Sequence, residues 1–171
     1  MLSAVEPANM IGDIFRLHAC FPKKPGKAFR RFDGKTAYGV HPTLAAMLFI
    51  QEELLPEDFR IRGCKALLGH DLIEDTLADL PDWCLAPGVI ELVRGLTFEE
   101  GEDSFESVWS RSDDVILLKL YDATINLMNS SCYDPEKYKL RLAKTRKLTD
   151  YVEIKFGPLN IIKIARGLLG R

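Results

Sequence analysis

The stretch CKALLGHDLIEDT, residues 64–76, places one histidine and three carboxylates in a segment that otherwise has the composition of a buried helix. At about 100° per residue, His70, Asp71, Glu74 and Asp75 fall within an arc of roughly 140° on one helix. Apolar residues occupy both this arc and the opposite side, so the helix has no clean solvent-facing side. Burying carboxylates is costly unless they are paired or bind a cation. The stretch therefore predicts a functional site on a core helix; the alternative is an acidic cluster on the surface of an amphipathic helix.

A second polar stripe lies in DDVILLKLYDATINLM, residues 113–128, where nearly every other residue is apolar. Lys119, Asp122 and Asn126 share a stripe roughly 60° wide on the same helical wheel. Such a helix is expected at the centre of the fold. Asp122 is then either a core carboxylate paired with Lys119 or a further ligand of a metal held by residues 70–71. His41, in YGVHPTLAA, is at the start of a predicted helix. It is a candidate ligand only because the other candidate ligands are present in the chain.

Two histidines and two aspartates form a plausible ligand set for a divalent ion such as Mn²⁺, Fe²⁺ or Zn²⁺. A bound ion of this kind lowers the pKa of its water and supplies a nucleophile near neutral pH. Glu74 and Asp75 come one turn later, where they could orient that water or accept its proton. The sequence therefore predicts a metal centre formed by His41, His70, Asp71 and Asp122.

The rest of the chain has helical periodicity, and no stretch alternates apolar and polar residues for long enough to predict a sheet. Helices are predicted over residues 9–21, 41–55, 60–77, 89–96, 103–112, 113–130, 134–156 and 159–171. There is no internal repeat or convincing linker. We therefore predict a single all-α domain spanning residues 1–171.

Composition excludes several classes of function. Lys and Arg number 23 against 25 Asp and Glu, a net charge of −2, which does not suggest a nucleic-acid or membrane-surface protein. The N-terminal MLSAVEPANMIGD lacks the pattern of a secretory signal, and no segment supplies the roughly 20 apolar residues of a membrane span. The four cysteines are scattered, as in a reducing compartment. We expect a cytoplasmic protein that binds neither nucleic acid nor membrane.

The tail, residues 157–171, carries isoleucines and leucines beside basic residues. It could form a basic amphipathic helix for a membrane surface or a partner. We favour packing against the chain's own core or against a second subunit, which leaves a homo-oligomer possible.

Four pieces of the chain, in order, carry a family resemblance: RRFDGKTAYGVHP, ALLGHDLIEDT, VIELVRGLT and LLKLYDATINLM. In these, the chain resembles the HD-domain metal phosphohydrolases. Within them it is similar to the hydrolase module of the RelA/SpoT family and to small single-domain alarmone hydrolases. The resemblance covers about residues 28–130, and it implies the all-helical HD fold with a helical C-terminal extension over residues 131–171.

The resemblance also implies roles for individual residues. The implied metal ligands, usually of manganese, are His41, His70, Asp71 and Asp122, and the implied acidic pair that acts on the attacking water is Glu74 and Asp75. The implied nucleotide contacts are Asn126 and the basic pair Arg30 and Arg31. The implied reaction is hydrolysis of the 3'-pyrophosphate of ppGpp-like nucleotides, with release of pyrophosphate.

A basic segment precedes the first expected ligand. Its cations are Lys23, Lys24, Lys27, Arg30, Arg31 and Lys35, and between residues 23 and 35 they face a single acid, Asp33. Such a segment beside a metal centre would attract a polyphosphate, and we include Lys35 among the expected substrate contacts. For Lys23, Lys24 and Lys27 we favour a solvated loop whose lysines contact nothing.

Three departures from the family pattern leave the substrate open. Val40 stands where the family usually has Asn, and Asp122-Ala-Thr-Ile-Asn126 lacks the usual Arg and His. The loop FEEGEDSFE, residues 98–106, would repel phosphate if it faced the site. One alternative is a hydrolase of another nucleotide, such as a dNTP, a nucleoside polyphosphate or an NADP-like cofactor. Another is a module that binds nucleotides without turnover.

Overall fold

The structure, a computed structural model, describes residues 5–30, 32–99, 101–128 and 134–170. These residues form helices and connecting segments, and within them the only β-type pairings are the isolated bridges Pro22–Thr76 and Phe29–Ala37. The prediction of an all-α fold is confirmed. In chain order the elements are α1 (Val5–Cys20), η1 (Pro25–Ala28), α2 (Val40–Ile50), α3 (Glu57–Gly69), α4 (Leu72–Asp75), α5 (Asp82–Leu85), α6 (Ile90–Leu96), α7 (Ser104–Ser107), η2 (Val108–Ser110), α8 (Asp113–Met128), α9 (Pro135–Phe156) and α10 (Asn160–Leu169).

Helix α8 is the central element, as its composition predicts. Its residues from Val115 to Ile125 are all buried, and it packs against α2, α6, α9 and α10. Tyr121 meets Phe49 of α2 in an edge-to-face pair with ring centroids 5.1 Å apart. Such pairs contribute about 0.5–1.5 kcal/mol beyond the burial of their surface. The core therefore fixes the position of the polar stripe on α8 relative to α2.

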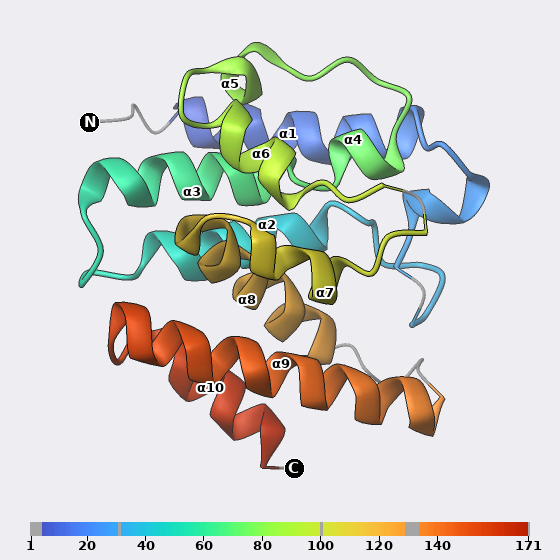
Figure 1. The fold of residues 1–171 in the computed structure, drawn as a ribbon. Helices are drawn as coiled ribbons and strands as arrows, with labels where there is room; N and C mark the ends of the chain where they lie inside the picture. The colour runs from blue at the N-terminus through green and yellow to red at the C-terminus, as the bar shows by residue number, and fades with distance from the viewer. Residues whose placement is uncertain (1–4, 31, 100, 129–133, 171) are drawn as a thin grey trace.

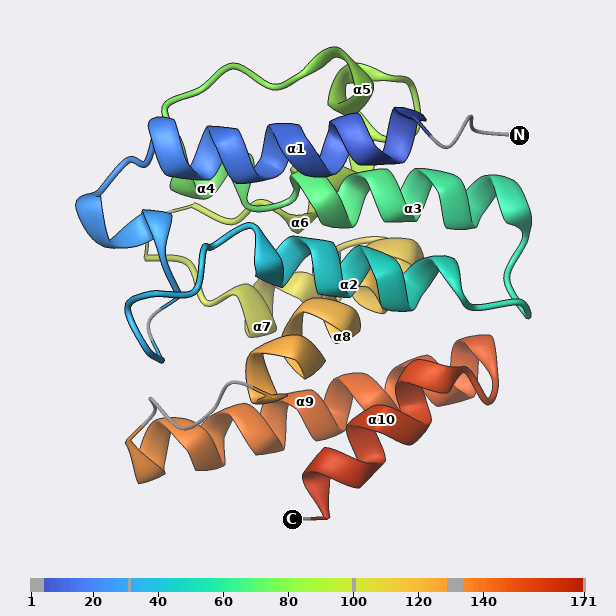
Figure 2. The same ribbon diagram turned by 180° about the vertical axis from the view of Figure 1, so that it is seen from behind.

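Helices α2 and α3 lie side by side in both ribbon views (Figures 1 and 2). Their close approach depends on Gly63, since a β-carbon there would lie 2.3 Å from Phe49 Cε1. This contact brings the C-terminal end of α3, where the His-Asp pair follows, close to the start of α2.

The predicted continuous helix over residues 60–77 is wrong in one respect. Helix α3 ends at Gly69, His70 and Asp71 form a turn, and α4 begins at Leu72. Asp71 has a ψ of −7°, away from the helical value of about −42°, so the axis changes direction there. The predicted helix over residues 41–55 is also too long, because α2 ends at Ile50. The His-Asp pair therefore lies at a corner between two helices.

Helices α9 and α10 lie at the end of the molecule opposite α1 (Figures 1 and 2). Ile161, Ile162 and Ala165 of α10 are buried, and α10 packs against α8 and α9. The expectation that the tail packs on the chain's own core is confirmed. The buried Glu52, just after α2, connects this helix to α8 and α10. Its carboxylate accepts hydrogen bonds from the Tyr121 hydroxyl of α8 (2.6 Å) and from the N–H groups of Asn160 and Ile161 at the start of α10 (both 2.9 Å).

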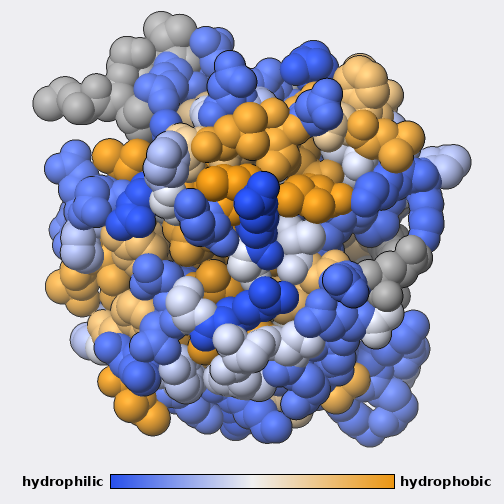
Figure 3. Space-filling view, turned by 45° about the horizontal axis from the view of Figure 1, so that its top comes forward, coloured by the Kyte–Doolittle hydropathy of each residue, from blue (hydrophilic) through white to orange (hydrophobic). Residues whose placement is uncertain are grey.

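On the face shown in Figure 3, hydrophilic side chains surround a band of hydrophobic ones. Over the described residues, no helix combines the length and the apolar character needed to cross a membrane.

Candidate metal centre and adjoining pocket

Three elements bring the predicted ligands together. His41 is in the first turn of α2, His70 and Asp71 form the corner between α3 and α4, and Asp122 is in the middle of α8. One ligand atom from each of His41, His70 and Asp71 lies within 4.8 Å of the other two. All four side chains belong to buried residues. This burial disfavours a surface acidic cluster as the explanation of residues 70–71.

Asp122 faces both imidazoles and a lysine. Its Oδ1 lies 2.9 Å from His41 Nε2 and 3.8 Å from His70 Nε2, and it accepts a hydrogen bond from Asn126 Nδ2 (2.7 Å). Its Oδ2 lies 2.7 Å from Lys119 Nζ. The two readings of Asp122, as a partner of Lys119 and as a residue of the ligand cluster, are therefore compatible in this geometry.

The chemistry of His70 tests whether these residues fit a cation. Its Nδ1–H donates to the Leu67 carbonyl at 2.7 Å, so Nε2 is the nitrogen that faces the cluster. Nε2 is buried and has no hydrogen-bond partner among the described residues, while Asp71 Oδ2 lies 3.2 Å away. A backbone carbonyl that orients an imidazole in this way is a common second contact of a metal-binding histidine. Two imidazoles and two carboxylates therefore fit a divalent cation.

The electrostatics of the cluster favour ionised carboxylates. Burial opposes the charged form of Asp122, but Lys119 and the two imidazoles outweigh it and hold its pKa well below the usual range. Burial likewise opposes ionisation of Asp71, yet His70 and His41 lower its pKa. Burial disfavours protonation of His70, but Asp71 and Asp122 outweigh it and raise the pKa of His70 to about 9. A proton and a cation therefore compete for His70 Nε2.

Tyr38 is a site residue that the sequence prediction missed. Its hydroxyl donates to Asp71 Oδ2 at 3.0 Å, and its ring stacks on that of His18 with centroids 4.6 Å apart. Both ring nitrogens of His18 are buried without a hydrogen-bond partner among the described residues, and burial lowers the pKa of this imidazole. The position of Tyr38, three residues before His41, is the signal that could have identified it.

Two of the expected substrate contacts lie together beside this cluster. Arg30 is buried, its guanidinium donates to Asn126 Oδ1 at 2.9 Å, and it lies over the Tyr38 ring at 5.2 Å. Lys35 is instead exposed on a turn, where its N–H donates to Asp33 Oδ1. The prediction for Arg31 falls outside the described residues. The structure thus connects Arg30 and Asn126 with Asp122 and leaves the Lys35 side chain on the surface.

The predicted acidic pair lies on α4 and is held by two separate contacts. Glu74 Oε1 accepts the N–H of Phe98 at 2.7 Å, and burial raises the pKa of Glu74 against the effect of this hydrogen bond. Asp75 is buried, and its Oδ1 accepts a hydrogen bond from the ammonium of Lys27. Each carboxylate is therefore already positioned by a donor from a distant part of the chain.

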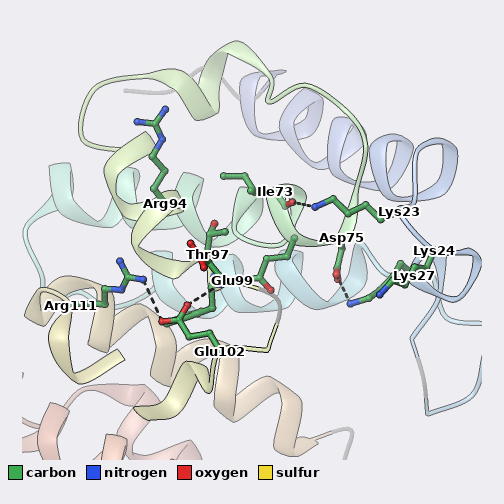
Figure 4. Close-up of a pocket in the computed structure, with 12 residues that line it drawn as sticks. Lys23, Lys24, Lys27, Ile73, Asp75, Arg94, Thr97, Glu99, Glu102 and Arg111 are labelled. Carbon is green, nitrogen blue, oxygen red and sulfur yellow. Dashed lines mark hydrogen bonds and ion pairs between the residues drawn. The ribbon is translucent and has the colours of Figure 1, made fainter. Parts of the chain in front are cut away.

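Glu74 and Asp75 also face a pocket of about 1110 Å³ (Figure 4). Its other lining residues are Lys23, Lys24, Lys27, Ile73, Arg94, Thr97, Phe98, Glu99, Glu102 and Arg111. In Figure 4 the lysines enter from one side, and Arg94 and Arg111 come from the other. The pocket therefore has cations at both sides and the predicted acidic pair among them.

Two predictions about this region change. The expectation that Lys23, Lys24 and Lys27 contact nothing is wrong: all three line the pocket, and Lys23 Nζ donates to the Ile73 carbonyl at 2.7 Å. The acidic loop after α6 does face the pocket, through Glu99 and Glu102. Glu102 Oε1 lies 4.0 Å from Arg111, which offsets part of its charge.

Comparison with known proteins gives one kind of match. No protein-family model matches the chain, and no curated protein sequence matches it. Among solved structures, it is similar to a metazoan ortholog of SpoT that hydrolyzes ppGpp and plays a role in starvation responses. The TM-score is 0.70 and the identity 18%, with 99% of this chain and 97% of that chain covered. At this identity the likeness shows the fold alone, and over nearly its whole length the chain has the all-helical fold of that SpoT-type hydrolase.

Proposed function

We propose that the chain is a metal-dependent hydrolase of nucleotide phosphate esters, with a ppGpp-like nucleotide as substrate and pyrophosphate as product. The observation that carries the proposal is the buried His70 Nε2, which has no hydrogen-bond partner among the described residues and faces two carboxylates beside a pocket with cationic sides. The shared fold with a ppGpp hydrolase supports the choice of substrate.

His41, His70, Asp71 and Asp122 would hold the cation, for which we propose Mn²⁺. When bound, such a cation lowers the pKa of water and makes it a nucleophile near neutral pH. Asp75 lines the pocket and is the proposed acceptor of the proton of the attacking water, while Glu74, fixed by the Phe98 N–H, orients that water.

The cationic residues of the pocket would bind the phosphates and offset their charge. In the proposed reaction the oxygen of water bonds to the phosphorus next to the 3' oxygen. The bond between that phosphorus and the 3' oxygen breaks, and the 3' oxygen leaves with a proton. Pyrophosphate and the nucleotide 3'-hydroxyl are the two products.

A second candidate is hydrolysis of a different nucleotide, such as a dNTP, a nucleoside polyphosphate or an NADP-like cofactor. The position of Glu99 and Glu102 in the pocket favours a substrate with a single phosphate chain, such as a dNTP, because these two carboxylates disfavour a second group of phosphates. In this case the metal cluster keeps its role and only the contacts to the rest of the substrate differ.

The experiment is a measurement of phosphate and pyrophosphate release from ppGpp, GTP, dNTPs and NADPH with Mn²⁺. Asp71→Ala is the control that removes a ligand, and Asp75→Ala should keep the metal but lose turnover. Pyrophosphate release from ppGpp that disappears in Asp71→Ala supports the first candidate. Activity on another nucleotide supports the second, and metal binding without turnover of any of them contradicts both and favours a binding module.

A further inference from the structure

The segment that carries Lys23, Lys24 and Lys27 is fixed along α4 by main-chain contacts. The N–H of Lys23 donates to the Asp75 carbonyl at 2.9 Å, and the N–H of Leu77 donates to the Phe21 carbonyl at 2.8 Å. The isolated bridge between Pro22 and Thr76 lies between these two bonds. The segment is therefore docked beside the acidic pair, and its lysines have defined positions at the pocket.

Lys27 has a particular partner in this arrangement. Its ammonium donates to Asp75 Oδ1, and the two side chains are 31% and 4% exposed, respectively. A carboxylate as buried as Asp75 needs a compensating charge, and the lysine supplies it from the pocket side. The pair therefore joins the proposed proton acceptor to the residues that are expected to bind phosphate.

Once a phosphate enters the pocket, it competes with Asp75 for the ammonium of Lys27. A phosphate beside α4 meets the carboxylates of Glu74 and Asp75, which repel it, and Lys27 contacts the second of them. A lysine ammonium is a compact charge on a flexible four-carbon stem, so it can exchange one anionic partner for another nearby. The partial exposure of Lys27 leaves it room to do so.

We propose that Lys27 exchanges partners: it holds Asp75 while the pocket is empty and moves to a phosphate of the ligand when the pocket fills. The inference rests on the proposed function for the identity of the ligand and of the proton acceptor. Asp75 loses its counter-ion only when a phosphate lies beside α4, so Lys27 is a positioning residue that links phosphate binding to the freeing of the base.

The test measures pyrophosphate binding by calorimetry at one fixed Mn²⁺ concentration, which needs no turnover. Lys27→Met should weaken binding about tenfold or more, as expected for loss of a hydrogen bond to a charged group. Lys27→Arg should restore most of this affinity, because it keeps the charge. Lys163→Met, which removes an exposed lysine on α10, is the matched control and should bind as the wild type does.

Asp75→Asn supplies the readout specific to exchange. It frees Lys27 in advance, so it should tighten pyrophosphate binding several-fold in the wild-type background and much less in the Lys27→Met background. Equal gains in both backgrounds, or a Lys27→Met affinity within twofold of the wild type, would overturn the proposal. If Lys27→Met does not fold, the double variant Lys27→Met/Asp75→Asn replaces it in the test, because it carries no unpaired buried charge. This double variant should bind pyrophosphate about tenfold more weakly than Asp75→Asn alone.

These outcomes separate the two proposals. A protein that hydrolyses no nucleotide in the panel but shows this coupling fails the proposed function and keeps the exchange. A protein that hydrolyses ppGpp without the coupling keeps the function and loses the exchange.

Discussion

The hydroxyl of Tyr38 provides a direct test of the metal cluster. Tyr38→Phe keeps the ring that stacks on His18 and removes only the donor to Asp71 Oδ2 at 3.0 Å. Loss of such an outer contact commonly weakens metal binding by about 10–100-fold. The hydrogen bond from Tyr38 to Asp71 is already present without the cation. It therefore contributes to metal affinity only by orienting the Asp71 carboxylate. We therefore expect the low end, about a tenfold rise in the Kd for Mn²⁺, or ~1.4 kcal/mol.

The assay is a calorimetric titration of metal-free protein with Mn²⁺. Tyr151→Phe is the matched control, because the Tyr151 hydroxyl also donates to a carboxylate, Asp113 Oδ1 at 2.5 Å, on an exposed part of the chain. The control should bind Mn²⁺ as the wild type does. A Kd for Tyr38→Phe within twofold of the wild-type value would refute the cation position inferred from Asp71, and so would an equal loss in both variants.

Three further predictions concern stability. Glu52→Gln should lower the free energy of unfolding by about 1–3 kcal/mol, because an amide donor then faces the N–H of Asn160 or that of the buried Ile161. Urea denaturation against Glu53→Gln, an exposed neighbour, checks this, and equal midpoints would contradict it. The Lys137 N–H lowers the pKa of Asp134 at the start of α9, so this cap stabilises the fold above the usual carboxyl range and is lost as pH falls through the folded-state pKa. Asp134→Asn keeps an acceptor, so its urea midpoint should fall less than that of the wild type between pH 7 and pH 3; an equal fall would argue against the cap's contribution. Removing Mn²⁺ with EDTA should lower the Tm, since the cation binds only the folded state, and an unchanged Tm in a thermal melt would count against a bound metal.

Helical periodicity was sufficient for the fold class and for the central position of α8. It failed at residues 70–71, because a helical wheel assumes one continuous axis. The chain turns where Gly69 packs against Cys84, with only 2.5 Å between an added β-carbon and the Cys84 Sγ. That contact joins segments distant in sequence, and local periodicity carries no information about it.

The candidate site, like the fold, could be predicted only in part from the sequence. The convergence of His41, His70 and Asp71 could be anticipated because their residue types suit one cation and their order along the chain resembles that of the HD-domain phosphohydrolases. The contacts of Lys23 with Ile73 and of Lys27 with Asp75 span 50 and 48 residues of sequence, and nothing local distinguishes these lysines from solvated ones. Only the folded chain shows that the basic segment lies along α4.

All three histidines of the chain lie in this one region. The rings of His41 and His70 are 5.5 Å apart, and His18 joins them through Tyr38. In a proton NMR spectrum every imidazole resonance therefore belongs to the site, with no background from the rest of the molecule. Paramagnetic Mn²⁺ would broaden the signals of His41 and His70 before that of His18, so the spectrum of the unlabelled protein alone would locate the ion.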